Sequence, residues 1–276
     1  MNLASRFLLL IVALVATTGL GRLQDTEPVV LRFKFKPGET LKFRSVNNET
    51  MTAGEESDDK VTTMTMGVTA GETKDGWADV SLGFTELEST DPSTAEVFPL
   101  FLDVKVGMKV DGRGTVKELT GAATKAESEA VAEIVEVMFT GVMNGGFMGV
   151  QYPEKGVKVG DTWTATLDAD ELMGGTLDIA TGGQATVKGK LDLKYEIKSF
   201  RTSNGLKLVE IAYTLSGTPT IDIGVASGTM VLKSSGTVLT DVANGMLVRM
   251  RQSTTAVLDL GVVKIENSSE QFMWRI

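Results

Sequence analysis

The sequence predicts a mainly β fold: a curved antiparallel sheet, or a partly open barrel, made of two tandem similar halves with one central amphipathic helix. Three observations lead to this prediction. Apolar and polar residues alternate along most of the chain, which is typical of strands that bury one face. A turn pattern occurs twice, and the apolar spacing typical of a helix occurs in one central segment.

The N-terminal segment, residues 1–21, is predicted to be an export signal peptide. It carries a positive charge at Arg6, then an unbroken apolar run from Phe7 to Ala16, then small and polar residues up to Gly21. A helix that crosses a bilayer needs about 20 apolar residues, so a retained anchor is the less favoured alternative. We therefore expect an exported protein, periplasmic or extracellular, that meets a membrane only transiently or through an uncleaved signal.

The repeated turn pattern indicates two similar halves. Lys36–Leu41 (KPGETL) recurs as Lys158–Trp163 (KVGDTW), and Gly114–Val116 recurs as Gly236–Val238; both offsets are 122 residues. Repeats of solenoid proteins are far shorter, so two half-domains are the better interpretation. The expected organisation is a first β half at residues 28–119, a helical connection at 120–149 and a second β half at 150–276.

Alternation assigns the strands of the first half. Residues 29–46 are predicted to form a hairpin, because Pro37-Gly38 interrupts the alternation there. Residues 54–60 are predicted to be a charged, solvated loop, and the Asp-Gly pair at 75–76 is favoured in tight turns. The other strands predicted in this half lie at residues 61–68, 78–87 and 104–110.

The segment 120–149 is the only one with a convincing helical pattern. Apolar residues such as Ala130 and Ile134 recur at steps of three and four, and acidic residues fall on another face. Thr124 with Glu127 forms a capping box, and Gly141 is placed to end the helix.

The second half resumes the alternation. Residues 163–167 are predicted to form a strand, and residues 174–183 a glycine-rich loop. The remaining strands are predicted at residues 187–197, 209–215, 221–232, 236–242, 246–255, 256–265 and 272–276. The total is about a dozen strands, mostly with connections short enough for antiparallel pairing.

The composition removes several classes of catalytic site. The chain has no histidine and no cysteine, which excludes imidazole and thiolate catalysis and nearly all zinc or copper sites. Residues 168–171 (Asp-Ala-Asp-Glu) are the best calcium-like cluster, but they lack the ligand spacing of an EF-hand. A net charge of −9 argues against nucleic acid as a partner. We expect no enzyme activity, no catalytic or metal site and no cofactor.

The candidate site is an apolar surface between the sheet and the predicted helix. Flexible methionine side chains suit the binding of variable apolar ligands, and the chain has 13 of them. The expected ligand contacts come from two strands and from the helix: Leu82, Phe84, Val106, Met108, Ile134, Met138 and Phe139.

Two resemblances add to this interpretation. The segments FKPGETLKF (35–43) and YPEKGVKVGDTW (152–163), together with the predicted signal, resemble a family of uncharacterised secreted bacterial proteins, a domain of unknown function. That likeness would cover nearly the whole mature chain and supplies no binding residues. A curved sheet covered by a helix is also similar, at the level of fold, to the periplasmic lipoprotein carriers, which implies a concave face that holds acyl chains.

The leading functional hypothesis is an exported, non-enzymatic binding protein that holds an apolar ligand, a lipid or a lipidated protein, between a curved sheet and a helix. The alternative is a structural or protein-interaction module of the bacterial cell envelope with a filled core. An outer-membrane barrel and an enzyme with a carboxylate pair are less favoured. An interior apolar cavity is the feature that separates the first two hypotheses.

Overall fold

The computed structural model describes residues 27–102, 104–120, 146–181, 184–261 and 263–276. The predicted signal peptide (1–21) and nearly all of the predicted helical connection (120–149), with its helix at 124–143, lie outside the described residues.

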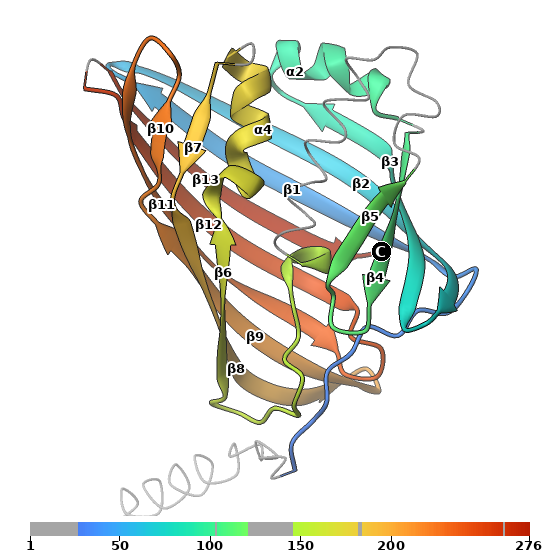
Figure 1. Cartoon of the computed structure of the whole chain (residues 1–276). Helices are drawn as coiled ribbons and strands as arrows, with labels where there is room; N and C mark the ends of the chain where they lie inside the picture. The colour runs from blue at the N-terminus through green and yellow to red at the C-terminus, as the bar shows by residue number, and fades with distance from the viewer. Residues whose placement is uncertain (1–26, 103, 121–145, 182–183, 262) are drawn as a thin grey trace, which may run out of the picture.

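One antiparallel sheet dominates the fold, and it is strongly curved (Figure 1). The strands follow one another as β5-β4-β3-β2-β1-β13-β12-β11-β9-β8-β6, while the short strands β7 and β10 pair with each other beside β11. The sheet does not close, because β5 and β6 are its two edges. In chain order the strands are β1 (Thr40–Ala53), β2 (Glu56–Lys74), β3 (Trp77–Ser89), β4 (Lys105–Asp111), β5 (Val116–Thr120), β6 (Thr162–Asp168), β7 (Thr186–Lys188), β8 (Lys190–Ser203), β9 (Leu206–Gly217), β10 (Thr220–Asp222), β11 (Ser227–Asp241), β12 (Leu247–Asp259) and β13 (Lys264–Arg275). The predicted mainly β fold with an open, curved antiparallel sheet is confirmed.

The strands form where the sequence alternates, because each strand buries one face against the interior. β8 alternates exposed and buried residues over most of its length, as expected for a half-buried strand. Two-residue turns join the long hairpins. Asp75-Gly76 links β2 to β3, and Asn204-Gly205 links β8 to β9, with positive φ at all four residues. Such turns match the right-handed twist of the strands that they join.

The repeated turn has the same hydrogen bonds in both places. Gly38 precedes β1 and Gly160 precedes β6, with φ of 80° and 88°. The Gly38 N–H donates to the carbonyl of Ala70 on β2 at 2.8 Å, and the Gly160 N–H donates to that of Ile197 on β8 at 2.9 Å. Strands from both sides of residue 150 therefore share one sheet and begin with the same turn. The exact boundaries of the predicted halves stay a prediction.

The predicted hairpin at residues 29–46 is wrong. Residues 30–36 form no strand, because both edges of β1 are already occupied by β2 and β13. The segment instead hydrogen-bonds to loops at the narrow end of the sheet. The Phe33 N–H donates to Gly112 O at 2.8 Å, and the Lys34 N–H donates to Asn244 O at 2.9 Å.

The predicted charged loop at 54–60 is also wrong, since β2 begins at Glu56 and only Gly54 and Glu55 form the turn. These charged residues extend the β1–β2 hairpin, where backbone pairing needs no apolar side chains. The predicted break between the strands at 246–255 and 256–265 is misplaced as well, because β12 continues to Asp259 and β13 begins at Lys264.

The predicted glycine-rich loop at 174–183 is largely helical: α4 spans Ala169–Thr181. The Asp168 carboxylate accepts a hydrogen bond from the Asp170 N–H at 3.0 Å, beside the start of the helix. Leu172 and Leu177 pack on a second, smaller core around Leu191. This packing offsets the cost of a helical glycine, about 1 kcal/mol each. A short helix, α2 (Pro92–Val97), and a 3-10 turn, η1 (Phe98–Leu100), follow β3.

Candidate functional site

The concave side of the sheet holds an apolar cavity of about 520 Å³. In Figure 1 the long strands β1, β2, β13, β12 and β11 form the back of the curved sheet, and α4, β6 and the turn η2 (Phe147–Gly149) lie in front of them. The lining residues are Met64, Met66, Leu82, Phe84, Gly146, Phe147, Met148, Gly149, Leu167, Leu172, Leu193, Tyr213, Leu215, Ser234, Met250, Gln252 and Met273. Residues from β2, β3, β6, β8, β9, β11, β12, β13, α4 and η2 thus line one space.

Strand register explains why distant segments meet here. Met64 on β2 lies opposite Ser45 on β1, Ser45 lies opposite Met273 on β13, and Met273 lies opposite Met250 on β12. Residues that are directly opposite on neighbouring strands point to the same face of a sheet. One row across four strands therefore places three methionines in the cavity wall.

Methionine side chains make up much of the cavity wall. Five of the 13 methionines line the cavity: Met64, Met66, Met148, Met250 and Met273. Unbranched thioether side chains adjust to irregular apolar shapes at low cost. The wall can thus fit apolar groups of more than one shape.

Two stacked rings lie behind Tyr213, an aromatic residue of the cavity wall. Trp163 and Tyr195 stack with centroids 4.9 Å apart, and Tyr213, which faces the cavity, lies 6.4 Å from Tyr195. The Tyr195 hydroxyl donates to Gly149 O at 3.2 Å. Burial raises the pKa of Tyr195 and of Tyr213, because desolvation penalises the phenolate. Both hydroxyls are neutral donors.

A short polar network interrupts the apolar lining. The Tyr213 hydroxyl donates to Gln252 Oε1 at 2.7 Å, Gln252 Nε2 donates to Thr254 Oγ1 at 3.0 Å, and Thr254 Oγ1 donates to Ser234 Oγ at 2.9 Å. These groups satisfy one another, as buried polar groups generally must. The network stabilises the wall between β9 and β12.

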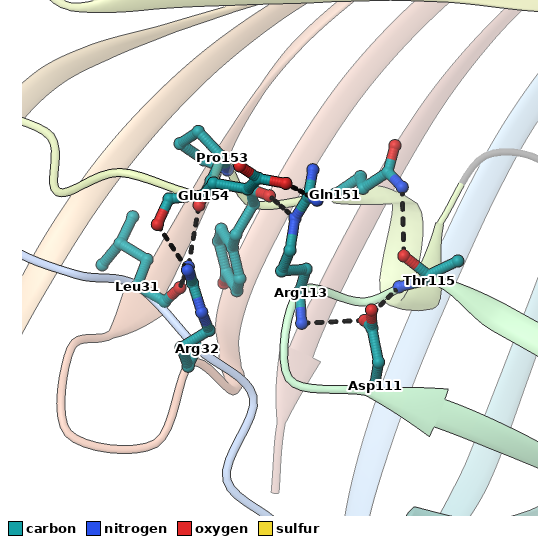
Figure 2. Close-up of polar contacts among 9 residues, drawn as sticks. Leu31, Arg32, Asp111, Arg113, Thr115, Gln151, Pro153 and Glu154 are labelled. Atoms are coloured by element: carbon teal, nitrogen blue, oxygen red, sulfur yellow. Dashed lines mark hydrogen bonds and ion pairs between the residues drawn. The ribbon is translucent and has the colours of Figure 1, made fainter. Parts of the chain in front are cut away.

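Residues 150–157, here called the strap, run from η2 toward β6 and close the narrow end of the curved sheet. Figure 2 shows two arginines that hold it. Arg32 donates to the carbonyls of Pro153 and Glu154 at 2.7 and 2.5 Å, and Arg113 donates to Tyr152 O at 3.0 Å. Arg113 also forms an ion pair with the Glu154 carboxylate at 3.1 Å.

Aromatic packing seals the same end. Phe33 lies 4.8 Å from Tyr152 and 5.1 Å from Phe147 between ring centroids. The Tyr152 hydroxyl is buried and donates to Gly245 O at 2.8 Å. Burial raises the pKa of Tyr152, so this hydroxyl also keeps its proton. The strap and the N-terminal segment thus pack together as the floor of this end of the sheet.

The residues predicted to contact a ligand divide into three groups. Leu82 and Phe84 on β3 line the cavity. Val106 and Met108 on β4 are buried in the main core and are not among its lining residues. Ile134, Met138 and Phe139 lie outside the described residues. Ligand contact by any of the seven stays a prediction.

Sequence reasoning missed the contribution of the second half. Leu193, Leu215, Met250 and Met273 all line the cavity. The alternation of apolar and polar residues in β8 could have identified Leu193, because it places Leu193 on the same face as the buried Tyr195.

Acidic groups form no metal site in the described part of the chain, where no three acidic side chains are close enough to hold an ion. Asp168, from the predicted calcium-like cluster, bonds the Asp170 N–H at the start of α4. Asp170 and Glu171 lie in the first turn, where the helix dipole favours negative charge.

The comparisons with known proteins concern the fold. No protein-family model and no curated protein matches this chain. The chain is similar to lipovitellin, in a solved structure described for its lipid–protein interactions: the TM-score is 0.51 at 10% identity, over 88% of this chain and 25% of that one. The chain thus spans about a quarter of lipovitellin. At this identity the likeness shows a shared fold only.

Two exported or lipoprotein structures also match, at lower scores. The lipoprotein YmcC from Escherichia coli gives a TM-score of 0.25 at 10% identity, over 81% of this chain and 85% of that one. An exported protein with a YmcC-like fold from Bacteroides fragilis gives 0.26 at 9% identity, over 87% and 96%. The resemblance to a secreted bacterial family therefore stays a prediction. None of the helices in the described residues is long and apolar enough to span a bilayer.

Proposed function

We propose that the protein is an exported, non-enzymatic binding protein that holds the apolar part of a lipid, or of a lipidated partner, in the concave cavity. The observation that carries the proposal is the cavity itself: about 520 Å³, walled by Leu, Phe and Met side chains from both ends of the chain. Its volume lies within the roughly 300–1,000 Å³ of small-ligand pockets.

The lining of this space is almost entirely apolar, and the space is partly open to solvent. A ligand that covers the lining removes apolar surface from water, which is favourable by about 25 cal/mol per Å². The cavity therefore favours an apolar ligand over the alternative of a module with a filled core.

Residue chemistry supports binding rather than catalysis. The sequence has no histidine and no cysteine, and the cavity wall offers neutral tyrosine, serine and glutamine groups that bond one another. Lipovitellin, described for its lipid–protein interactions, has a sheet of the same kind. That likeness concerns the fold, and the cavity of this chain carries the proposal.

A fluorescent fatty acid tests the proposal. Cis-parinaric acid should bind the full chain saturably, with enhanced fluorescence. Met64→Trp, which places an indole in the cavity wall, should weaken binding at least tenfold. The matched control is Val61→Trp on the same strand, because Val61 is 38% exposed and its side chain lies on the opposite face. Both variants should be compared at equal folded fraction, judged by thermal unfolding.

Saturable binding that only Met64→Trp weakens supports a ligand in the cavity. Absence of saturable binding to the folded protein, or equal effects of both variants, contradicts it and favours a structural module of the cell envelope.

A further inference from the structure

A polar patch continues the cavity wall on the concave face. It consists of Asn47 on β1, Thr62 on β2, and Ser269 and Gln271 on β13. Asn47 lies directly opposite both Thr62 and Gln271 in the strand register. Directly opposite side chains have Cβ atoms about 5 Å apart, so three of the four form one compact group.

The patch adjoins the methionine part of the cavity. Thr62 is two residues from Met64 on β2, and Gln271 is two residues from Met273 on β13. Residues two apart on a strand share a face and lie roughly 7 Å apart. A molecule that lies along the strands thus passes from an apolar to a polar wall over the length of a few bonds.

Several polar groups of the patch are available for hydrogen bonds to a ligand. Asn47, Thr62 and Ser269 are half-buried, and their side chains make no hydrogen bond within the part of the chain that the structure describes. Gln271 uses its Nε2 to donate to Ser45 Oγ at 3.0 Å, which leaves its carbonyl oxygen available. Half-buried polar groups without partners are suited to a ligand that brings donors and acceptors.

The charges beside the patch cancel. Glu49 and Lys60 lie one step further along the same face and pair with each other at 3.4 Å, and Asn267 Nδ2 donates to Glu49 at 2.5 Å. The chain as a whole carries a net charge of −9, which disfavours an anionic ligand. The surroundings therefore match an uncharged head with hydroxyl groups.

We propose that the ligand is a single-chain amphiphile with an uncharged, hydroxylated head: its chain lies among the cavity methionines and its head bonds to the polar patch. This inference rests on the proposed function. If a methylene takes up about the volume of a water, roughly 30 Å³, 520 Å³ accommodates on the order of fifteen to twenty carbons, which fits one acyl chain rather than two.

Three competitors with the same chain length test the head group. Monododecanoylglycerol, dodecanoic acid and dodecylamine compete with cis-parinaric acid for the full chain. The monoacylglycerol should displace the probe at a concentration at least tenfold lower than either charged amphiphile. A double variant, Asn47→Leu with Thr62→Val, should reduce that preference about tenfold, since each hydrogen bond contributes roughly a factor of three to ten.

The chain supplies a matched control. Asn48 and Thr63 are the same residue types, one position further along the same strands, with side chains on the opposite face. Asn48→Leu with Thr63→Val should leave the preference unchanged.

The outcomes separate the two proposals. Equal displacement by all three amphiphiles, or a preference for a charged head, overturns the inference about the head while the cavity still binds a chain. A preference that both double variants reduce equally also overturns it. If neither the probe nor monododecanoylglycerol, titrated directly, binds to the folded protein, the proposed function fails as well.

Discussion

The turn between β11 and β12 gives the sharpest test of how the floor of the cavity is held. Gly245 has a φ of 70°, and an added Cβ would lie 2.6 Å from the carbonyl carbon of Arg32 and 2.8 Å from the backbone nitrogen of Phe33. Backbone atoms cannot rotate aside, so Gly245→Ala should push the N-terminal segment away. Gly38→Ala is the matched control, because Gly38 has a φ of 80° and no heavy atom within 4 Å of the same Cβ position.

The two substitutions share one cost and differ in another. A non-glycine residue in the left-handed region costs about 1–2 kcal/mol, partly offset by about 0.4–1 kcal/mol from the stiffer unfolded chain. Gly38→Ala should therefore lose about 1 kcal/mol. Gly245→Ala also weakens the hydrogen bonds Lys34 N–H to Asn244 O and Tyr152 hydroxyl to Gly245 O, each about 1 kcal/mol, and loosens the packing of Phe33. Its total loss should reach about 3–4 kcal/mol.

Urea unfolding followed by tryptophan fluorescence measures both values, since Trp163 is stacked on Tyr195 in the folded state. The expected difference between the two variants is about 2–3 kcal/mol in the free energy of unfolding. Equal losses would refute the reasoning, because they would mean that the N-terminal segment does not lie against this turn.

Two further predictions concern tyrosines. All three tyrosines of the chain, Tyr152, Tyr195 and Tyr213, have pKa values raised by burial, so the folded state keeps their protons at a pH where the unfolded state loses them. These groups should leave the free energy of unfolding unchanged below about pH 10 and lower it as the pH rises further. Tyrosinate absorbance should appear together with unfolding. A normal tyrosine titration near pH 10 in the native protein would contradict this prediction. Tyr152→Phe removes the donor to Gly245 O and should cost about 1–3 kcal/mol in urea unfolding, whereas no loss would mean that this carbonyl finds another partner.

Local chemistry made the strands predictable from the sequence. Alternation depends only on neighbours along the chain, and pairs such as Asp75-Gly76 determine their own turn, so most strands were predicted close to where they lie. The N-terminal segment could not be assigned in the same way. Its alternation is that of a strand, but β2 and β13 occupy both edges of β1, and that competition is a property of the whole sheet.

The helix α4 and the cavity, like the N-terminal segment, are determined by tertiary contacts that the local sequence does not reveal. The glycines at 174 and 175 disfavour a helix, and the packing of Leu172 and Leu177 against the second core outweighs them. Leu82 and Phe84 were identified because their strand alternates cleanly. Met64 and Met273 were missed because curvature decides which rows of the sheet face the interior.

The central claim, that an apolar chain occupies the concave cavity, is tested most directly by NMR of methyl-labelled methionine during titration with monododecanoylglycerol. The signals of the five cavity methionines, Met64, Met66, Met148, Met250 and Met273, should shift with one common dissociation constant. Met108 and Met246, which are buried in the core and do not line the cavity, should not shift. A titration that moves Met108 or Met246 and leaves the five unchanged would contradict the account.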